Sequence, residues 1–280
     1  MKNYIKKTGP DFFEFLKQKA LEIRKETLRI HGVANETRLA SSLSCVEIFV
    51  TLYYGGILNF NPENINWEER DRFIISKGHG SISFYPVLAD LGYFDKKELG
   101  RVCKEGSFLG GIPDPVIPGY ETINGSLGHG LGVACGMALA LKRRNRKENV
   151  FVLLGDGELY EGSVWEAVMF SGEHRVDNLV LIIDNNKICM LDYCRNILDL
   201  EPIEEKFRAH KWAVDRVDGH DIVRLHASLQ RLKGAAEGKP KVLIADTIKG
   251  KGVQCLEGDS LCHIKSLKQE DIDLIIEGLK

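Results

Sequence analysis

Two short polar segments stand directly after apolar runs and carry residue types that bind a metal–diphosphate pair. The sequence GDG (155–157) follows the run 150–154, and DNN (184–186) follows the run 179–183. Glycine allows a sharp turn that brings backbone amides close to a phosphate, and the Asp156 carboxylate would repel that phosphate unless a cation lay between them. Carboxylate, amide, carbonyl and phosphate oxygens together suit Mg²⁺. The two segments therefore predict a Mg²⁺ bridge to a diphosphate whose identity stays open.

Each segment alone is typical of a turn, so the prediction depends on the elements that position it. The runs 150–154, 179–183 and 242–246 are rich in Leu, Ile and Val without alternation, as in strands covered on both faces of a parallel sheet. Helical patterns cover 11–31, 44–56 with Ser44 as N-cap, 127–144 as a tightly packed buried helix, 162–175 and 219–238. This alternation predicts an α/β fold with a doubly wound, mostly parallel sheet, whose ligands bind beyond the carboxyl ends of the strands.

Composition excludes several classes of protein. The 280 residues carry a formal net charge of -2, which gives no general attraction to nucleic acid or to a membrane surface. The N-terminal segment has no signal-peptide core, and no apolar run approaches the roughly 20 residues that span a bilayer. Seven cysteines without CxxC spacing predict reduced thiols, and we expect a cytoplasmic protein. Six histidines are expected at the surface or in caps: His31, His129, His174, His210, His220 and His226.

The segment 155–188, GDGELYEGSVWEAVMFSGEHRVDNLVLIIDNNKI, resembles the thiamine-diphosphate signature of transketolases. Three further stretches resemble other segments of that family: SKGHG within 71–94, NGSLGHG within 124–140, and TIKGKGV (247–253) with the later CHIK. The resemblance covers nearly the whole chain but only the diphosphate-binding domain of the family. We therefore expect residues 1–280 to form one such domain, with the pyrimidine and C-terminal domains absent from this chain.

The resemblance implies a role for each matching residue. Asp156, Asn186 and the backbone carbonyl of Ile188 would bind Mg²⁺. The residues implied to contact thiamine diphosphate are His79, Gly125, Leu127, Asp156, Gly157, Asn186, Ile188, Lys249 and His263. Catalytic roles are implied for His79, His263 and Glu161, the last at the interface with the other half of the enzyme. Lys77 and Lys265 would line the approach of the substrate.

Two positions depart from the family pattern. Arg38 in NETRLASS and Ile112 in GGIPDP stand where transketolases carry histidines that help to bind the two-carbon unit. Isoleucine forms no hydrogen bond, so a ketose hydroxyl buried against it would lose roughly 1–3 kcal/mol. One hypothesis is an altered donor, a 2-keto acid such as pyruvate, with its methyl group facing Ile112 and a substrate carboxylate or phosphate on Arg38. The other is that ketol transfer persists and that other groups hold the ketose.

The resemblance also implies a partner. The family activates its cofactor with a glutamate of the pyrimidine domain, so we expect that glutamate on a second transketolase-like subunit, in a heterotetramer of two copies of each chain. The expected function is transfer of a two-carbon ketol or acyl unit to an aldehyde or ketone sugar acceptor, active only with that partner. Alternatives are an ordinary ketose-phosphate transketolase subunit, a keto-acid dehydrogenase- or decarboxylase-type subunit, and a non-catalytic partner. SKGHG and KGKGV disfavour the keto-acid class, and intact Asp156 and Asn186 disfavour a non-catalytic role.

Overall fold

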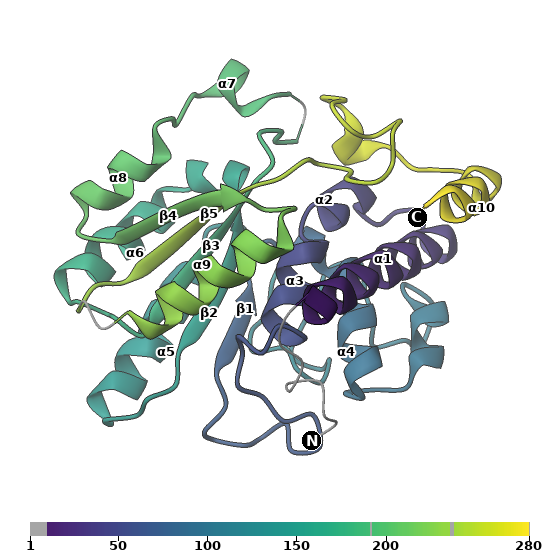
Figure 1. Ribbon diagram of the computed structural model, residues 1–280. Coiled ribbons are helices and arrows are strands. Elements are labelled where there is room, and N and C mark those ends of the chain that lie inside the picture. Colours follow the sequence, from purple (N-terminus) through teal and green to yellow (C-terminus); the bar gives the residue numbers. More distant parts are fainter. Residues whose placement is uncertain (1–9, 191, 236–237, 280) are drawn as a thin grey trace.

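A sheet of five parallel strands forms the centre of the molecule (Figure 1). In the computed structural model, which describes residues 10–190, 192–235 and 238–279, the strand order is β1-β2-β3-β5-β4. The strands are β1 (Arg72–Ile75), β2 (Val150–Gly155), β3 (Leu179–Asn185), β4 (Ala213–Asp218) and β5 (Lys241–Asp246). All residues of β2 and β3 are buried, which fits their apolar composition without alternation.

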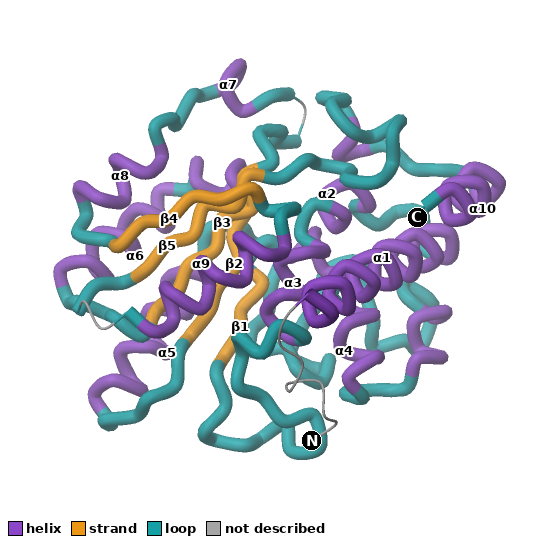
Figure 2. The backbone as a smooth tube through the Cα atoms, in the orientation of Figure 1, coloured by secondary structure: helices purple, strands orange, loops and turns teal. Residues whose placement is uncertain are grey.

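Helices cover both faces of this sheet (Figure 2). Alternate residues of β2 separate into two cores: Phe151 and Leu153 face one, while Val152 and Leu154 face the other. The first core contains residues of α1 (Pro10–Val33), α2 (Leu39–Leu43), α3 (Val46–Tyr53), α4 (Tyr85–Leu91), α9 (Ile222–Gly234) and α10 (Gln269–Gly278). The second contains residues of α5 (Gly130–Arg143), α6 (Gly162–Glu173) and α8 (Ile203–Ala209). The doubly wound α/β prediction is confirmed.

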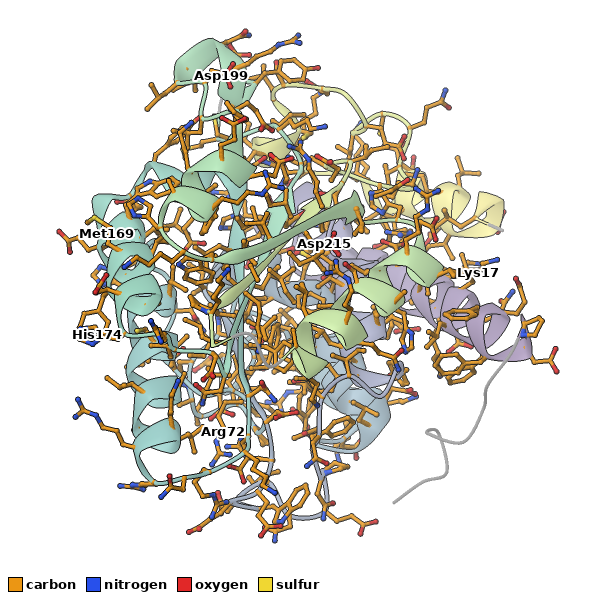
Figure 3. All side chains as sticks on the ribbon, turned by 60° about the vertical axis from the view of Figure 1, so that its left-hand side comes forward. Lys17, Arg72, Met169, His174, Asp199 and Asp215 are labelled. Atoms are coloured by element: carbon orange, nitrogen blue, oxygen red, sulfur yellow. The ribbon has the colours of Figure 1, made fainter. Side chains whose placement is uncertain are left out.

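Most of the predicted elements are present. The three predicted strands correspond to β2, β3 and β5, and the patterns over 11–31, 162–175 and 219–238 correspond to α1, α6 and α9. The periodicity of α1 buries Phe12, Leu16 and Ala20 on one stripe against the first core, as the spacing requires. Side chains on the outer face of α6, including Met169 and His174, point away from the sheet (Figure 3).

Three details of the sequence prediction are wrong. Ser44 is not the N-cap of α3, because Cys45 holds that position, and the Ser44 hydroxyl donates to Asp184 at 2.7 Å. The helix within 127–144 is not buried all round, since Val133 on α5 is 42% exposed. Of the histidines assigned to the surface, His31 and His226 are buried, because each ring makes hydrogen bonds inside the fold.

All seven cysteines are free. Along the described part of the chain, no helix has both the length and the apolar character that crossing a membrane requires.

Candidate cofactor and metal site

The carboxyl ends of β2 and β3 lie side by side, because Gly155 pairs with Asp184 in the parallel ladder. After Gly155 the chain turns into a short 3-10 helix, η4 (Asp156–Tyr160). The Asp156 carboxylate accepts hydrogen bonds from the Gly157 amide, at 2.7 Å, and from the Lys187 amide. Asp156 therefore joins the two strand ends that the sequence predicts to act together.

The amide of Asn186 is held in one orientation. Its Nδ2 donates to Asp184 Oδ2 at 3.3 Å, and its Oδ1 accepts from the Ile188 amide at 3.2 Å. The carbonyl oxygens of Ile188 and Cys189 both accept from Lys249 Nζ, at 2.7 and 2.8 Å. Lys249, which is 2% exposed, thus fixes the backbone that follows β3.

The charge at this edge of the sheet favours a bound cation. Burial and the negative charge of Asp184 raise the pKa of Asp156 to about 6, against the opposing effects of the Lys187 amide and of Lys249. A divalent cation beside Asp156 would stabilise the ionised carboxylate that the fold disfavours. The site therefore has an electrostatic reason to take up a metal ion.

The donor atoms fit Mg²⁺ and not a metal that prefers nitrogen or sulfur. Among the described residues no group of three or more His, Cys, Asp and Glu side chains is placed to hold a metal ion. Asp156, Asn186 and Ile188 border one cavity and offer a carboxylate, an amide oxygen and a carbonyl oxygen. Such an all-oxygen set suits Mg²⁺, whose remaining positions would fall to phosphate oxygens or water.

These residues open into a cavity of about 550 Å³ at the carboxyl ends of the strands. All nine predicted cofactor residues line it: His79, Gly125, Leu127, Asp156, Gly157, Asn186, Ile188, Lys249 and His263. Position 157 is tightly packed, since a Cβ there would lie 3.2 Å from Cβ of Cys189. Ile112 also lines the cavity, and its side chain is 52% exposed. The lining therefore combines oxygen ligands for a metal ion with apolar side chains.

Two neutral histidines lie together in the cavity. The rings of His79 and His263 are 5.3 Å apart, and Nδ1 of His263 lies 3.2 Å from the Ser41 hydroxyl. Burial lowers the pKa of His263 to about 3, assisted by the positive charges of Lys249 and Arg38, and it lowers the pKa of His79 well below its usual value. A neutral imidazole can both donate and accept a hydrogen bond, which suits contact with substrate oxygens.

Lys77 is buried at the wall of the cavity. Lys77 is 1% exposed and its ammonium pairs with Asp184, while it also donates to the Ser41 carbonyl at 2.8 Å and to the Ser44 hydroxyl at 3.1 Å. Although burial lowers the pKa of Lys77, the charge of Asp184 raises it. Lys77 lines the cavity, and its ammonium is engaged by Asp184, the Ser41 carbonyl and the Ser44 hydroxyl.

The remaining predicted residues lie around the cavity. Arg38 is half-buried just before α2, and its charge acts on both histidines. Glu161 is exposed at the start of α6. Lys265 is exposed and pairs with Asp259. None of these three lines the described cavity.

Sequence reasoning missed two buried carboxylates. Asp184 accepts from Lys77, Ser44, Thr247 and Asn186, and Glu158 accepts from two backbone amides and a serine. Glu158 directly follows GDG, and Asp184 is the first residue of DNN. A charged residue at the end of an apolar run was the available signal, but its partners come from distant segments.

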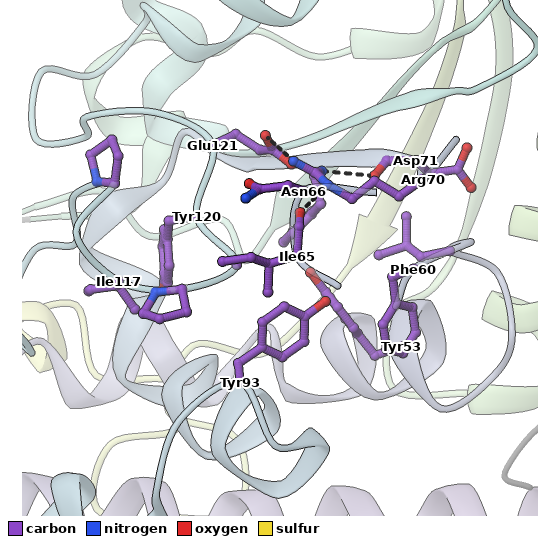
Figure 4. A pocket seen from close by; sticks show the side chains of 15 residues that line it. Tyr53, Phe60, Ile65, Asn66, Arg70, Asp71, Tyr93, Ile117, Tyr120 and Glu121 are labelled. Atoms are coloured by element: carbon purple, nitrogen blue, oxygen red, sulfur yellow. Dashed lines mark hydrogen bonds and ion pairs between the residues drawn. The ribbon is translucent and has the colours of Figure 1, made fainter. Parts of the chain in front are cut away.

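A smaller cavity of about 160 Å³ lies near the amino-terminal end of β1 (Figure 4). Tyr53 and Tyr93 line it, together with an Arg70–Glu121 pair in which Nη2 donates to Oε2 at 3.1 Å. It contains none of the predicted site residues. The cavity at the carboxyl ends is therefore the candidate site.

Comparisons with known proteins show the family of the chain. The family model described as transketolase, thiamine diphosphate binding domain, matches residues 23–279. The chain is 38% identical to the 6-deoxy-6-sulfo-D-fructose transketolase subunit of Clostridium sp. (strain MSTE9), over 91% of this chain and 92% of that protein. It is 37% identical to an apulose-4-phosphate transketolase subunit of Actinobacillus succinogenes, over 96% of this chain and 97% of that protein.

Full-length transketolases match over a part of their length. The crystal structure of transketolase from Campylobacter jejuni superposes with a TM-score of 0.88 at 30% identity, covering 95% of this chain and 43% of that one. Human transketolase is 34% identical over 94% of this chain and 42% of its own length. This chain thus spans less than half of the single-chain enzymes and nearly all of the two separate subunits. It belongs to the transketolase family, as a counterpart of the thiamine-diphosphate-binding domain.

Proposed function

We propose that this chain binds thiamine diphosphate through Mg²⁺ and acts, with a second subunit, as a transketolase-like carboligase. Residues 1–280 form the diphosphate-binding domain, and Asp156, Asn186 and the Ile188 carbonyl hold the metal ion. The observation that supports this most strongly is the convergence of these three oxygen donors with His79 and His263 on one cavity. The family to which the chain belongs points to the same cofactor.

The chain's own residues have distinct tasks in this proposal. Gly157 lets the backbone approach the diphosphate, Lys249 adds positive charge near it, and Gly125 and Leu127 form the wall against its rings. When bound, thiamine diphosphate supplies the electron sink that carbon–carbon bond cleavage and formation next to a carbonyl require. His79 and His263, held neutral by burial, hydrogen-bond to the oxygens of the substrate.

Calorimetric titration tests the cofactor and the metal together. Thiamine diphosphate is expected to bind the purified chain with Mg²⁺, and chelation of Mg²⁺ with EDTA should weaken binding at least about tenfold, because the diphosphate then faces Asp156 without a cation between them. Free thiamine, which has no diphosphate, is the control and should bind weakly in both conditions. Absence of binding with Mg²⁺ would overturn the proposal.

The proposed partner is a second transketolase-like subunit that carries the pyrimidine domain and the catalytic glutamate, in a complex of two copies of each chain. Two relatives that match over nearly their full length are described as subunits. Around the cavity the chain exposes large apolar side chains that water does not favour: Ile112, Met190, Ile197, Leu198, Leu261 and Ile264. The first three line the cavity, Leu198 and Ile264 directly follow Ile197 and His263, and Leu261 lies two residues before His263.

For the donor we propose a 2-keto acid such as pyruvate, which loses carbon dioxide and transfers its two-carbon acetyl unit to a sugar aldehyde or ketone. The observation in favour is Ile112, an apolar side chain at the cavity wall with nothing to offer a ketose hydroxyl. Arg38 supplies a positive charge near both histidines for the carboxylate. The second candidate is a ketose-phosphate donor, and the names of the two relatives, which are ketose transketolases, favour it.

Replacing Ile112 with His is expected to separate these donors. In the reconstituted enzyme, Ile112→His should raise kcat/KM for xylulose 5-phosphate and lower it for pyruvate, each by about tenfold, because an imidazole satisfies a buried hydroxyl and crowds a methyl group. Steady-state assays with both donors measure the ratio. Ile123→His, in the same segment at 80% exposure, is the matched control and should change neither value. Wild-type turnover of xylulose 5-phosphate with none of pyruvate would rule out the keto-acid donor.

A further inference from the structure

The Glu158 carboxylate is buried beneath the cavity and joins three separate segments. Its side chain is 2% exposed. One oxygen accepts from the Gly128 amide at 2.8 Å and from the Ser76 hydroxyl, and the other accepts from the Gly155 amide at 3.3 Å. The donors thus come from the end of β1, from the turn before α5 and from the end of β2. No metal, cofactor or catalytic role assigned above uses this carboxylate.

Ser76 extends the connection to the first turn of α5. Its hydroxyl donates to Glu158 and accepts from the Gly130 amide at 3.1 Å. A Cβ at Gly130 would lie 2.4 Å from Cβ of Ser76, so the helix start packs directly on the end of β1. The Gly128 carbonyl is also held, by the Ser163 hydroxyl at 3.0 Å. Both peptide groups of Gly128 are therefore fixed from below.

The segment fixed in this way carries the cavity wall. Gly125 and Gly128 have positive φ angles of 120° and 86°. Gly125 and Leu127, which belong to this turn, line the cavity. The first residues of this segment, Asn124 to Ser126, are half-buried or exposed, whereas Gly128 and Gly130 at its other end are buried. The anchorage of this wall is thus concentrated at its Gly128 end.

We propose that Glu158 is a positioning residue that sets the distance between the Gly125–Leu127 wall and the rings of the cofactor. A buried carboxylate that accepts three hydrogen bonds holds its donors more firmly than neutral acceptors do, and each amide would otherwise be buried without a partner. The inference rests on the proposed function, since it assumes that the rings lie against this wall. Its specific consequence is that Glu158 acts on ring recognition and leaves recognition of the metal–diphosphate unchanged.

Two probes separate these effects in the full chain. Calorimetry with Mg²⁺ gives the affinity for each of two probes. Thiamine diphosphate has both rings and a diphosphate, whereas inorganic pyrophosphate has no rings. Wild type is expected to prefer thiamine diphosphate. In Glu158→Gln this preference should fall by roughly tenfold, because glutamine has one accepting oxygen for three donors, while pyrophosphate affinity stays unchanged. Ser76→Ala, which removes one donor, should give a smaller loss of the same kind.

The matched control is Asp71→Asn. Asp71 is also a buried carboxylate that bridges amides of two loops, from Asn149 at 2.7 Å and Asn59 at 2.9 Å, but it lies at the start of β1, at the opposite end of the sheet. It should lower the melting temperature without changing the ratio of the two affinities. The inference is overturned if the ratio of the two affinities is unchanged in both Glu158→Gln and Ser76→Ala. It is also overturned if these variants lose affinity for both probes equally, or if wild type does not prefer thiamine diphosphate. A wild type that binds neither probe refutes the proposed function itself.

Discussion

Adding the proposed pyrimidine-domain subunit is expected to raise two-carbon transfer by the purified chain from background by at least about a thousandfold, the range that a positioned proton acceptor contributes. The cavity itself has no carboxylate free for that task. Of the two that line it, Asp156 accepts from two backbone amides and Glu158 from three donors. A proton acceptor therefore has to come from the partner.

Product formation measured at increasing ratios of the two subunits tests this expectation. Activity should saturate at equal amounts, and light scattering should give the mass of two copies of each chain. A partner whose catalytic glutamate is replaced by glutamine should bind equally well without restoring activity. Full turnover by this chain alone would refute the two-component enzyme.

The exposed apolar side chains around the cavity allow a second test of the same prediction. Leu198, which follows α7 (Cys194–Ile197), is 56% exposed, and α7 stands above the carboxyl ends of the strands (Figure 1). Leu198→Asp should weaken association, because burying a charge at an interface costs free energy. Leu274→Asp on α10, where the same residue type is 69% exposed, is the matched control and should have no effect.

The site was predictable where its chemistry is local to a strand end. GDG and DNN each stop an apolar run, and parallel strands necessarily bring such stops to one edge. The structure shows why that reasoning succeeds: Gly155 and Asp184 pair directly. Strands β1 and β4 were not predicted, because β1 has only four residues and β4 is a half-buried strand with charged residues in its sequence.

The errors concern side chains whose partners are distant in sequence. Ser44 looks like an N-cap, yet its hydroxyl donates to Asp184, which is more than 100 residues away in the sequence. A charge at the end of a buried strand requires partners, but the sequence does not say which ones. The same applies to Glu158, whose three donors come from three segments. The motifs can therefore be recognised in the sequence, but the hydrogen-bond partners of their buried carboxylates depend on tertiary packing.

Asp156→Asn is expected to weaken Mg²⁺-dependent binding of thiamine diphosphate by at least about a hundredfold, the upper end of what loss of an outer-shell partner costs a metal site. Yet the metal-free variant should melt within about 5 °C of wild type. The pKa of Asp156 is raised from 3.8 to about 6 by burial first and by Asp184 second, so the ionised group lowers stability. This loss of stability is absent below pH 3.8 and complete above about pH 6. Asp156→Asn removes it, which offsets the loss of one of the two backbone hydrogen bonds that the carboxylate accepts.

Calorimetry and thermal unfolding, each with and without Mg²⁺, distinguish a metal ligand from a residue that only maintains the fold. If Asp156 is a metal ligand, Mg²⁺ should raise the melting temperature and the cofactor affinity of wild type and should raise neither in Asp156→Asn. Without Mg²⁺, Asp156→Asn should bind thiamine diphosphate no more weakly than wild type, because the substitution removes the carboxylate that repels the diphosphate. Asp71→Asn should retain the full response to Mg²⁺. If Asp156→Asn binds the cofactor with a Mg²⁺ dependence within about threefold of wild type, a difference below about 1 kcal/mol, Asp156 does not hold the metal.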